Sequence, residues 1–573
     1  MKSIGRIAVG VVAQFVILTS SAWSQTVTVV GEDVLALPAS AGAPPLARVN
    51  VLREAPDGTH RLFLNDLRGA FYVLDGGTLS TYLDLAIEIP NLKTSPGLGS
   101  GFVSFAFDPE FAASGLFYTA HTEFVDVAVP NLEPAIPTTI IQHAVLTEWA
   151  STSPAANVFA GTRRELMRIA SPHRFHNIQE IAFNPYATPT DPDYRLLFIG
   201  NGDYGSIEIV EPNQLQRLDT IWGTVLRIDP LGGPFTRGGI TYDYGIPSDN
   251  PFVDGDSDTF DEIYAYGFRN THRLAWDPAN GNLYGSDIGQ GNFEEINLIV
   301  PGRNYGWPLR EGSMALDPLV PEIVFALPLD DATLGFTYPV AFYDHGTGSA
   351  IAGGFPYRGV GILDLNGKFL FGDIVTGEIF HADIADLEAA DDGDPTTFAT
   401  ITSAVFVHGG LSSTLLQVVR DAAADQGIGR TDLRFALDAG GELLITTKQD
   451  GFIRRLVAST GAGPGRAPTT MRVERLPAGD LELRWNAPAC SGAADFAVFE
   501  GSIGNWTSHQ SVICTDTAGD LRETLPPAAG NRYYLVVPID AQSEGSFGVD
   551  SSGAERFRPA TAGCRAVQDL TCL

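Results

Sequence analysis

Short runs of apolar residues, separated by polar turns that contain glycine, recur through the first four-fifths of the chain. The clearest pairs of runs are residues 61–66 with 69–74, 368–373 with 377–380, and 442–450 with 451–456, and single runs occur at 115–120, 195–200, 224–228 and 281–286. Short strands at recurring spacing, with Gly and Asp in their turns, are typical of β-propeller blades. We therefore predict an all-β fold that is mainly a propeller, with a β-sandwich or a β-helix as the alternative.

The pattern changes near residue 458. Residues 458–468 are rich in Gly, Ala and Pro, which is typical of a linker. Beyond it, residues 481–485 and 533–537 alternate like half-buried strands. We predict a propeller over residues 25–457 and a small β-sandwich over residues 469–573, which resembles a fibronectin type III domain. Few helices are expected, and residues 414–424 form either a helix or a loop.

The first 24 residues have the pattern of a signal peptide. Lys2 and Arg6 are basic, residues 7–18 are mostly apolar, and Ala22-Trp23-Ser24 resembles a cleavage site. A membrane anchor is the alternative, but the apolar run is short for a span. No later segment of the sequence is long and apolar enough to cross a bilayer. We expect export to a periplasm or to the medium.

Charge and cysteine content narrow the possible partners. The formal net charge is −32, which repels phosphate backbones, so nucleic acid is not an expected partner. The four cysteines are Cys490, Cys514, Cys564 and Cys572, and four cysteines allow three pairings. An exported protein favours disulfides over metal thiolates. Proximity in the sequence suggests the pairs Cys490–Cys514 and Cys564–Cys572.

Candidate chemistry concentrates between residues 262 and 308. Arg269-Asn270 follows a β-like run, a Gly-Gln-Gly turn at 289–291 precedes Glu294-Glu295, and Asn-Tyr-Gly-Trp-Pro occupies 304–308. This order of motifs resembles the quinoprotein glucose/sorbosone dehydrogenase family, whose members use pyrroloquinoline quinone (PQQ) and calcium. The resemblance extends over residues 46–456 and implies a propeller with six blades.

The resemblance implies roles for four side chains. His176 precedes the strand that leads to Asp203 and matches the family's general base, a task that suits imidazole because its unperturbed pKa lies near neutrality. His173 is a competing assignment, and a polar histidine held at a blade edge is the alternative for either residue. Arg269 and Asn270 match the cofactor-binding pair, and a guanidinium beside the quinone would polarise the carbonyl that receives hydride. Arg434 matches one of two further cofactor-binding arginines.

A calcium site is also implied by the resemblance. The family binds calcium through backbone carbonyls of a turn, a following carboxylate and a carbonyl near a tyrosine. The matching positions are Gly289, Gln290, Glu295 and Tyr305. Hard oxygen ligands of this kind suit calcium better than a transition metal. An ordinary acidic turn is the alternative.

Three positions depart from the family pattern. Val375 or Thr376 stands where a cofactor-binding lysine is expected, Asp432 where a second arginine is expected, and Gly99 where a glutamine is expected. PQQ carries three carboxylates, so the loss of cations should weaken its binding. The departures place the chain closer to a divergent branch that includes hedgehog-interacting-protein-like propellers.

Two functions are therefore compared. The first is an exported, PQQ- and calcium-dependent dehydrogenase for a sugar or an aldehyde, with electrons passing to an unidentified acceptor. The second is a secreted, non-catalytic propeller that binds a glycan or a protein. The missing cations favour the second function, whereas His176 and Arg269 favour the first. His345 and His272 are expected to be polar residues at blade edges, although His272 is near enough to Arg269 in the sequence to line a pocket.

Overall fold

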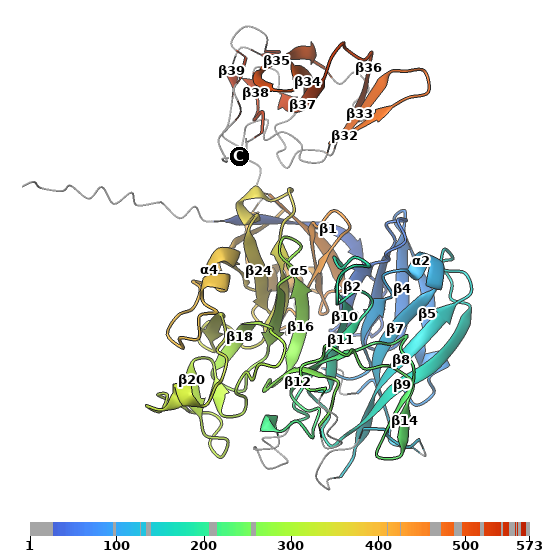
Figure 1. Cartoon of the computed structure of the whole chain (residues 1–573), viewed down its shortest axis with the longest axis vertical. Helices are drawn as coiled ribbons and strands as arrows, with labels where there is room; N and C mark the ends of the chain where they lie inside the picture. The colour runs from blue at the N-terminus through green and yellow to red at the C-terminus, as the bar shows by residue number, and fades with distance from the viewer. Residues whose placement is uncertain are drawn as a thin grey trace, which may run out of the picture.

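The computed structural model of the chain is drawn in Figure 1. It describes residues 27–95, 99–126, 128–132, 139–205, 215–253, 259–409, 411–424, 426–458, 471–485, 495–515, 521–539 and 543–548, together with residues 556, 558–559, 563–565 and 567–568. The predicted signal peptide and all but the first residue of the predicted linker lie outside the described residues. Among the described residues, no helix is both long enough and apolar enough to span a membrane.

Six sheets form the larger part of the described chain, and each begins with the strand nearest its centre. The sheets are β2 (Val49–Glu54) to β5 (Thr78–Asp84) through β3 (Leu62–Asp66) and β4 (Ala70–Asp75); β6 (Phe102–Phe107), β7 (Leu116–Glu123), β8 (Gln142–Ser151) and β9 (Gly161–Ser171); β10 (Ile178–Phe183), β11 (Leu197–Asn201), β12 (Thr224–Ile228) and β15 (Ile263–Tyr266); β16 (Thr271–Trp276), β17 (Leu283–Asp287), β18 (Phe293–Leu298) and β22 (Ala341–Asp344); β23 (Ile351–Tyr357), β24 (Lys368–Asp373), β25 (Ile379–Asp383) and β26 (Thr402–Ser403); and β29 (Leu433–Leu437), β30 (Leu443–Thr447), β31 (Phe452–Ala458), β1 (Thr28–Ala36), β27 (Val405–His408) and β28 (Leu411–Ser412).

The six sheets close into a ring. Their first strands touch in the cyclic order β2, β6, β10, β16, β23 and β29, and β29 touches β2 again. The N-terminal strand β1 pairs antiparallel with β31, so the two ends of the propeller chain share one sheet. This closure confirms the predicted all-β propeller, because a closed ring leaves only short edges exposed. The strands predicted from the apolar runs are β3, β4, β7, β11, β12, β17, β24, β25, β30 and β31.

Helices are short among the described residues. They are α1 (Leu85–Glu88), α2 (Phe111–Ser114), α4 (Ile384–Ala389) and α5 (Leu415–Ala422), with 3-10 turns at Asp331–Thr333 and Leu363–Leu365. The predicted helix near 414–424 is therefore α5, and the Thr414 hydroxyl caps it by accepting the N–H of Gln417. Small sheets extend from the loops as β13 (Phe235–Arg237) with β14 (Ile240–Tyr242), and as β19 (Arg310–Glu311), β20 (Met314–Leu316) and β21 (Val324–Phe325).

A second all-β module, drawn in orange and red in Figure 1, follows the propeller. One sheet contains β32 (Met471–Arg475), β33 (Leu481–Trp485) and β36 (Arg522–Leu525), and the other contains β35 (Asn505–Ile513), β34 (Asp495–Ser502), β37 (Arg532–Ile539), β38 (Ser543–Glu544) and β39 (Val567–Gln568). Side chains of both sheets, including Trp485, Phe496 and Val536, share one apolar core. The module is therefore a small sandwich, and its likeness to a fibronectin type III domain stays a prediction.

The disulfide pairing predicted from sequence proximity is wrong. Cys514 is bonded to Cys564, which lies 50 residues further along the chain. Cys514 directly follows β35, and the N–H of Cys564 donates to Glu544 at the end of β38 in the same sheet. Sheet pairing therefore decides which cysteines meet. Cys490 and Cys572 lie outside the described residues.

A β-bulge recurs in the first strand of five sheets. The bulges fall between Val49 and Val51, Phe102 and Ser104, Ile178 and Glu180, Thr271 and Arg273, and Ile351 and Gly353. Each leaves one residue outside the regular ladder, namely Asn50, Val103, Gln179, His272 or Ala352. Bulges re-aim side chains, and two of these residues, Gln179 and His272, line the central cavity described next.

Candidate active site

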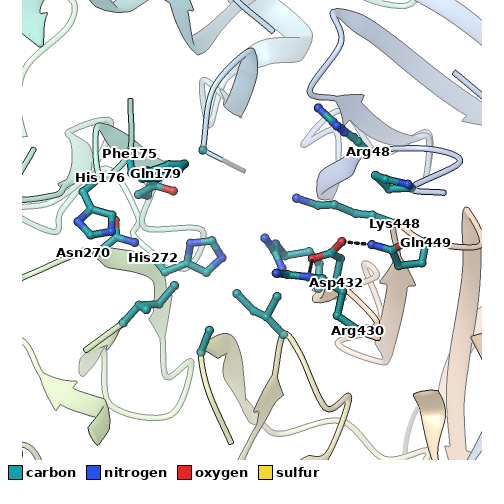
Figure 2. Close-up of a pocket in the computed structure, with 16 residues that line it drawn as sticks. Arg48, Phe175, His176, Gln179, Asn270, His272, Arg430, Asp432, Lys448 and Gln449 are labelled. Atoms are coloured by element: carbon teal, nitrogen blue, oxygen red, sulfur yellow. Dashed lines mark hydrogen bonds and ion pairs between the residues drawn. The ribbon is translucent and has the colours of Figure 1, made fainter. Parts of the chain in front are cut away.

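A cavity of about 440 Å³ lies at one end of the ring. Its lining includes residues on or just before the first strand of every sheet: Arg48, Gly99, Gln179, His272, Ala350 and Arg434. His176 and Asn270 lie on one side, Arg48 and Lys448 on the other, and His272 lies between them (Figure 2). The sequence predicted His176, Asn270 and Arg434 as site residues, and the fold brings all three to this cavity.

His176 is held in a strained, close-packed turn before β10. Its φ angle is 55°, in the left-handed region that non-glycine residues seldom occupy. A Cβ atom at Gly202 would lie 2.5 Å from the His176 carbonyl oxygen, so only glycine fits there. The imidazole Nδ1 lies 2.8 Å from Oδ1 of Asp203, and the His176 side chain is 16% exposed. The strain is of the kind that accumulates at functional sites.

Asp203 fixes the orientation and the tautomer of His176. Its carboxylate is buried and also accepts hydrogen bonds from Trp307 Nε1 at 3.0 Å and from the N–H of Gly205 at 2.9 Å. Burial raises the pKa of Asp203, but His176 and Arg269 outweigh burial and hold that pKa below its ordinary value. A carboxylate only accepts, so Nδ1 carries the proton. The Nε2 atom of the neutral ring then has a free lone pair, as a general base requires.

The protonation of His176 is tuned by its surroundings. Burial lowers its pKa, the Arg269 charge lowers it further, and Asp203 opposes both effects. The net pKa lies below the ordinary value of 6.5. The imidazole is therefore neutral near pH 7 and able to accept a proton. His173 is not among the cavity-lining residues, and its ring packs on Phe175 at 5.4 Å, which favours His176 over His173 as the base.

Arg269 organises the neighbouring loop. Its Nε and Nη2 donate to Gln290 Oε1 at 2.9 and 2.7 Å, and its Nη1 donates to the carbonyl of Ile288 at 3.0 Å. The guanidinium lies 5.7 Å from the centre of the Trp307 ring. The backbone N–H groups of Arg269 and Asn270 both donate to Asp287, at 2.9 and 2.6 Å. Asn270 itself lines the cavity, and its buried Oδ1 has no partner within the described part of the chain.

Sequence comparison missed most of the cations at the cavity. Besides Arg434, the lining contains Arg48, Arg430 and Lys448, against one carboxylate, Asp432. Asp432 is bonded to Arg430 Nε and to Gln449 Nε2, both at 2.6 Å. The position that the family pattern leaves acidic is therefore neutralised locally. Burial, and secondarily Arg273, lowers the pKa of Arg434 to about 9, as expected where cations outnumber anions.

The other two departures are also offset by neighbours or lie aside. Gly99 lines the cavity, and a Cβ atom there would lie 3.2 Å from the amide nitrogen of Gln179. The bulge residue Gln179 therefore places an amide where the sequence comparison expected one from residue 99. Val375 is not among the lining residues, whereas its neighbour Ile374 is. No single-residue motif would have found Gln179, Arg48 or Lys448, because each comes from a different sheet.

The predicted calcium positions surround a loop that an internal carboxylate already orders. The backbone N–H groups of Gln290, Gly291, Asn292 and Phe293 all donate to Oε1 of Glu311, at 2.8 to 3.2 Å. The Tyr305 hydroxyl donates to the Leu298 carbonyl at 2.5 Å. The described residues contain no group of three or more His, Cys, Asp or Glu side chains placed to hold a metal ion.

Glu295 is the predicted calcium ligand with a charged side chain. It is the cross-strand partner of Asp287 in β17 and β18. Burial raises the pKa of Asp287 to about 7, and burial together with Asp287 raises the pKa of Glu295 well above its ordinary value. Two buried carboxylates of this kind suit a cation or a shared proton equally well. Glu294, on the other face, accepts from His345 at 2.8 Å and from the Ile351 N–H at 2.8 Å, so His345 is a strand-edge residue as predicted.

The sequence profile of glucose/sorbosone dehydrogenases matches residues 51–396. The chain belongs to this family. Its relatives include the HIPL1 protein of Arabidopsis thaliana, 26% identical over 56% of this chain and 50% of that protein. They also include quinoprotein glucose dehydrogenase B of Acinetobacter calcoaceticus, 27% identical over 39% of this chain and 42% of that protein. Hedgehog-interacting protein of Mus musculus is 24% identical over 55% of this chain and 40% of that protein.

These relatives confirm the predicted family and its hedgehog-interacting-protein-like branch. The chain spans about half the length of the HIPL1 protein, and less of the other two relatives. Among solved structures, a crystal structure of glucose dehydrogenase aligns with a TM-score of 0.50 and 18% identity, covering 76% of this chain and all of that one. This likeness supports the fold of the family member described here.

Proposed function

We propose that the chain is an exported dehydrogenase that oxidises a hydroxyl group of a sugar or an aldehyde with PQQ as its cofactor. The observation that carries this proposal is the His176–Asp203 pair, which faces a cation-rich wall across a single cavity. Family membership supports oxidation of a sugar. The predicted signal peptide supports export to a periplasm or to the medium.

The cavity fits the proposed cofactor in size and charge. A volume of about 440 Å³ lies within the range of small-molecule sites. PQQ carries three carboxylates, and four lining cations face one carboxylate of the protein. Asn270 and Arg434 would hold the cofactor, with Arg48 and Lys448 adding charge. Arg269 would order the loop at 288–290 beside it and add positive charge near the site. When bound, PQQ would supply the oxidant that accepts a hydride.

His176 would perform the proton transfer. Its neutral Nε2 would take the proton of the substrate hydroxyl while Asp203 stabilises the imidazolium that forms. Trp307 and Gly205 hold Asp203 in place, so the base needs little reorganisation during the reaction. The electron acceptor that completes the cycle is left unassigned. Calcium beside Gly289, Gln290, Glu295 and Tyr305 stays part of the proposal through family resemblance.

A non-catalytic binding propeller is the second candidate. Similarity to Hedgehog-interacting protein and the absence of the family's lysine at Val375 favour it. In that case the same cavity, with its excess of cations, would bind an anionic group of a glycan or protein. The two candidates differ in whether the His176–Asp203 pair turns over a substrate.

The test is reconstitution of the full mature chain with PQQ and calcium. Reduction of an artificial dye on addition of aldoses or aldehydes, together with the absorption spectrum of bound quinone, is the expected result. His176→Ala should abolish turnover but leave the quinone spectrum. His381→Gln is the matched control, because His381 is a buried histidine outside the cavity lining. No quinone spectrum and no dye reduction across a broad panel would instead favour the binding propeller.

A further inference from the structure

His272 is a buried imidazole on the floor of the cavity with no part in the proposed proton transfer. It is the bulge residue of β16, and 3% of its surface is exposed. Neither ring nitrogen has a hydrogen-bond partner among the described residues. Buried polar atoms in folded proteins are nearly always paired. A ligand in the cavity is a suitable partner, because His272 lines it (Figure 2).

The groups around His272 define what such a ligand must carry. Arg273, Arg434 and Lys448 are the charged groups that act on the ring, and burial together with these cations lowers its pKa well below the ordinary value. Lys448 Nζ and Arg434 Nε both donate to Asn50 Oδ1, at 2.7 and 3.2 Å. One neutral amide oxygen therefore serves two buried cations. Buried charge of one sign without a matching charge is unfavourable, so the floor favours an anion.

The imidazole adds a directional donor to this charge. A neutral imidazole offers one N–H donor and one acceptor. With the N–H directed at an anionic oxygen, it forms a charge-assisted hydrogen bond. Lys448 retains donor capacity after bonding Asn50, because an ammonium group has three N–H bonds. His272, Lys448 and Arg434 all line the same cavity, and so can meet one ligand group.

We propose that His272, with Lys448 and Arg434, binds a carboxylate of the cavity ligand and makes the cavity selective for polycarboxylates. The inference rests on the proposed function in that PQQ would be the natural ligand of this kind. It goes beyond the family motif, since the sequence analysis placed His272 only at a blade edge. His272 is thus assigned as a specificity-determining residue, distinct from the base His176.

The test uses a redox-inert probe, benzene-1,3,5-tricarboxylate, and the full mature chain with ¹⁵N-labelled histidine rings. The signal that disappears in His272→Gln should shift on titration with the probe. His272→Leu should weaken probe binding about 10- to 100-fold, as expected for one hydrogen bond to a charged group. Lys448→Met should weaken it similarly. His272→Gln, which keeps a neutral donor, should lose less, and His381→Gln should bind normally.

Several outcomes would overturn the inference. Wild-type probe affinity in His272→Leu, or an unmoved His272 signal at saturation, removes His272 from the binding site. Inorganic phosphate that binds as tightly as the tricarboxylate contradicts carboxylate selectivity. If His272→Leu does not fold, the ring signal and His272→Gln still decide. Probe binding without PQQ-dependent dye reduction would refute the proposed dehydrogenase but keep this site, whereas dye reduction with unchanged probe binding by His272→Leu would do the reverse.

Discussion

The Nδ1 atom of His176 lies 2.8 Å from Asp203 Oδ1, and the backbone N–H of Asp203 donates to the carbonyl of Arg269 at 2.7 Å. The second oxygen of Asp203 accepts from Trp307. Two motifs that are separate in the sequence, at 269–270 and 304–308, therefore support one histidine. This convergence is a physical reason why these motifs occur together: each positions a neighbour of the candidate base.

Asp203→Asn should impair turnover through the orientation of His176. The amide can present an N–H to the ring, which disfavours the tautomer with a free Nε2 lone pair. We expect kcat to fall on the order of 10²–10⁴-fold with PQQ affinity nearly unchanged. Asp203 raises the pKa of His176, so its replacement should also move the acid limb of kcat/KM to lower pH. An unchanged pH profile with reduced kcat would mean that Asp203 has only a structural role.

Arg269→Met should loosen the loop at 288–293. The substitution removes the hydrogen bonds to Gln290 Oε1 and to the Ile288 carbonyl. Each hydrogen bond to a charged group contributes about 1.5–3 kcal/mol, so both thermal stability and PQQ affinity should decrease. Arg217→Met is a matched control, because Arg217 is half-exposed and pairs only with Asp219 within the described residues. Equal losses in the two variants, measured by melting curves and quinone titration, would contradict the assignment.

The stability of the chain should fall as the pH drops below about 6.5. Burial, with the charges of Arg273, Arg434 and Lys448, lowers the pKa of His272 well below 6.5, and burial also lowers that of His176. Between the folded and unfolded pKa values the unfolded chain binds more protons, so acid favours unfolding in that window. Urea titrations at about pH 5 and about pH 7.5 measure the effect. His272→Gln should reduce the difference between the two midpoints, and an unaltered difference would rule out His272 as its source.

A chain that ends near Gly461 should fold without the sandwich. The propeller closes its own ring, because β1 pairs with β31 in the last sheet. The sandwich should instead depend on its disulfide Cys514–Cys564. Soluble expression and a cooperative melt of the shortened chain are the expected results. An insoluble shortened chain beside a soluble full chain would show that the boundary is misplaced.

The repeated strands and the Arg269–Trp307 motifs could be predicted because they depend on local order in the sequence. Alternation, glycine turns and motif spacing are short-range features. His176 was accessible for the same reason, since it precedes a recognisable strand and lies in a matching position. The helix α5 was left open between helix and loop, and its Thr414 cap decides for the helix.

The cationic wall could not be predicted, because ring closure assembles it from distant segments. Lys448 and Arg434 meet Asn50 across 398 and 384 residues of sequence. Asp432 read as a loss of positive charge until its pairing with Arg430 was visible. The disulfide was missed for a related reason, since pairing within a sheet, and not distance along the chain, brings Cys514 to Cys564. Sequence order gave no measure of these contacts.

Calcium should stabilise the loop that contains Gly289, Gln290 and Glu295. Binding to the native state alone raises stability by mass action, by about 2.7 kcal/mol at 100 times the dissociation constant. The paired carboxylates of Glu295 and Asp287 have raised pKa values, and a cation would compete with protons for them. The increase in melting temperature from millimolar calcium over EGTA should therefore shrink as the pH falls. Glu295→Gln mimics the protonated acid, so this variant should fold but lose the calcium response. An unchanged melting temperature, with no calcium by elemental analysis, would mean that Glu311 and Arg269 hold the loop without metal.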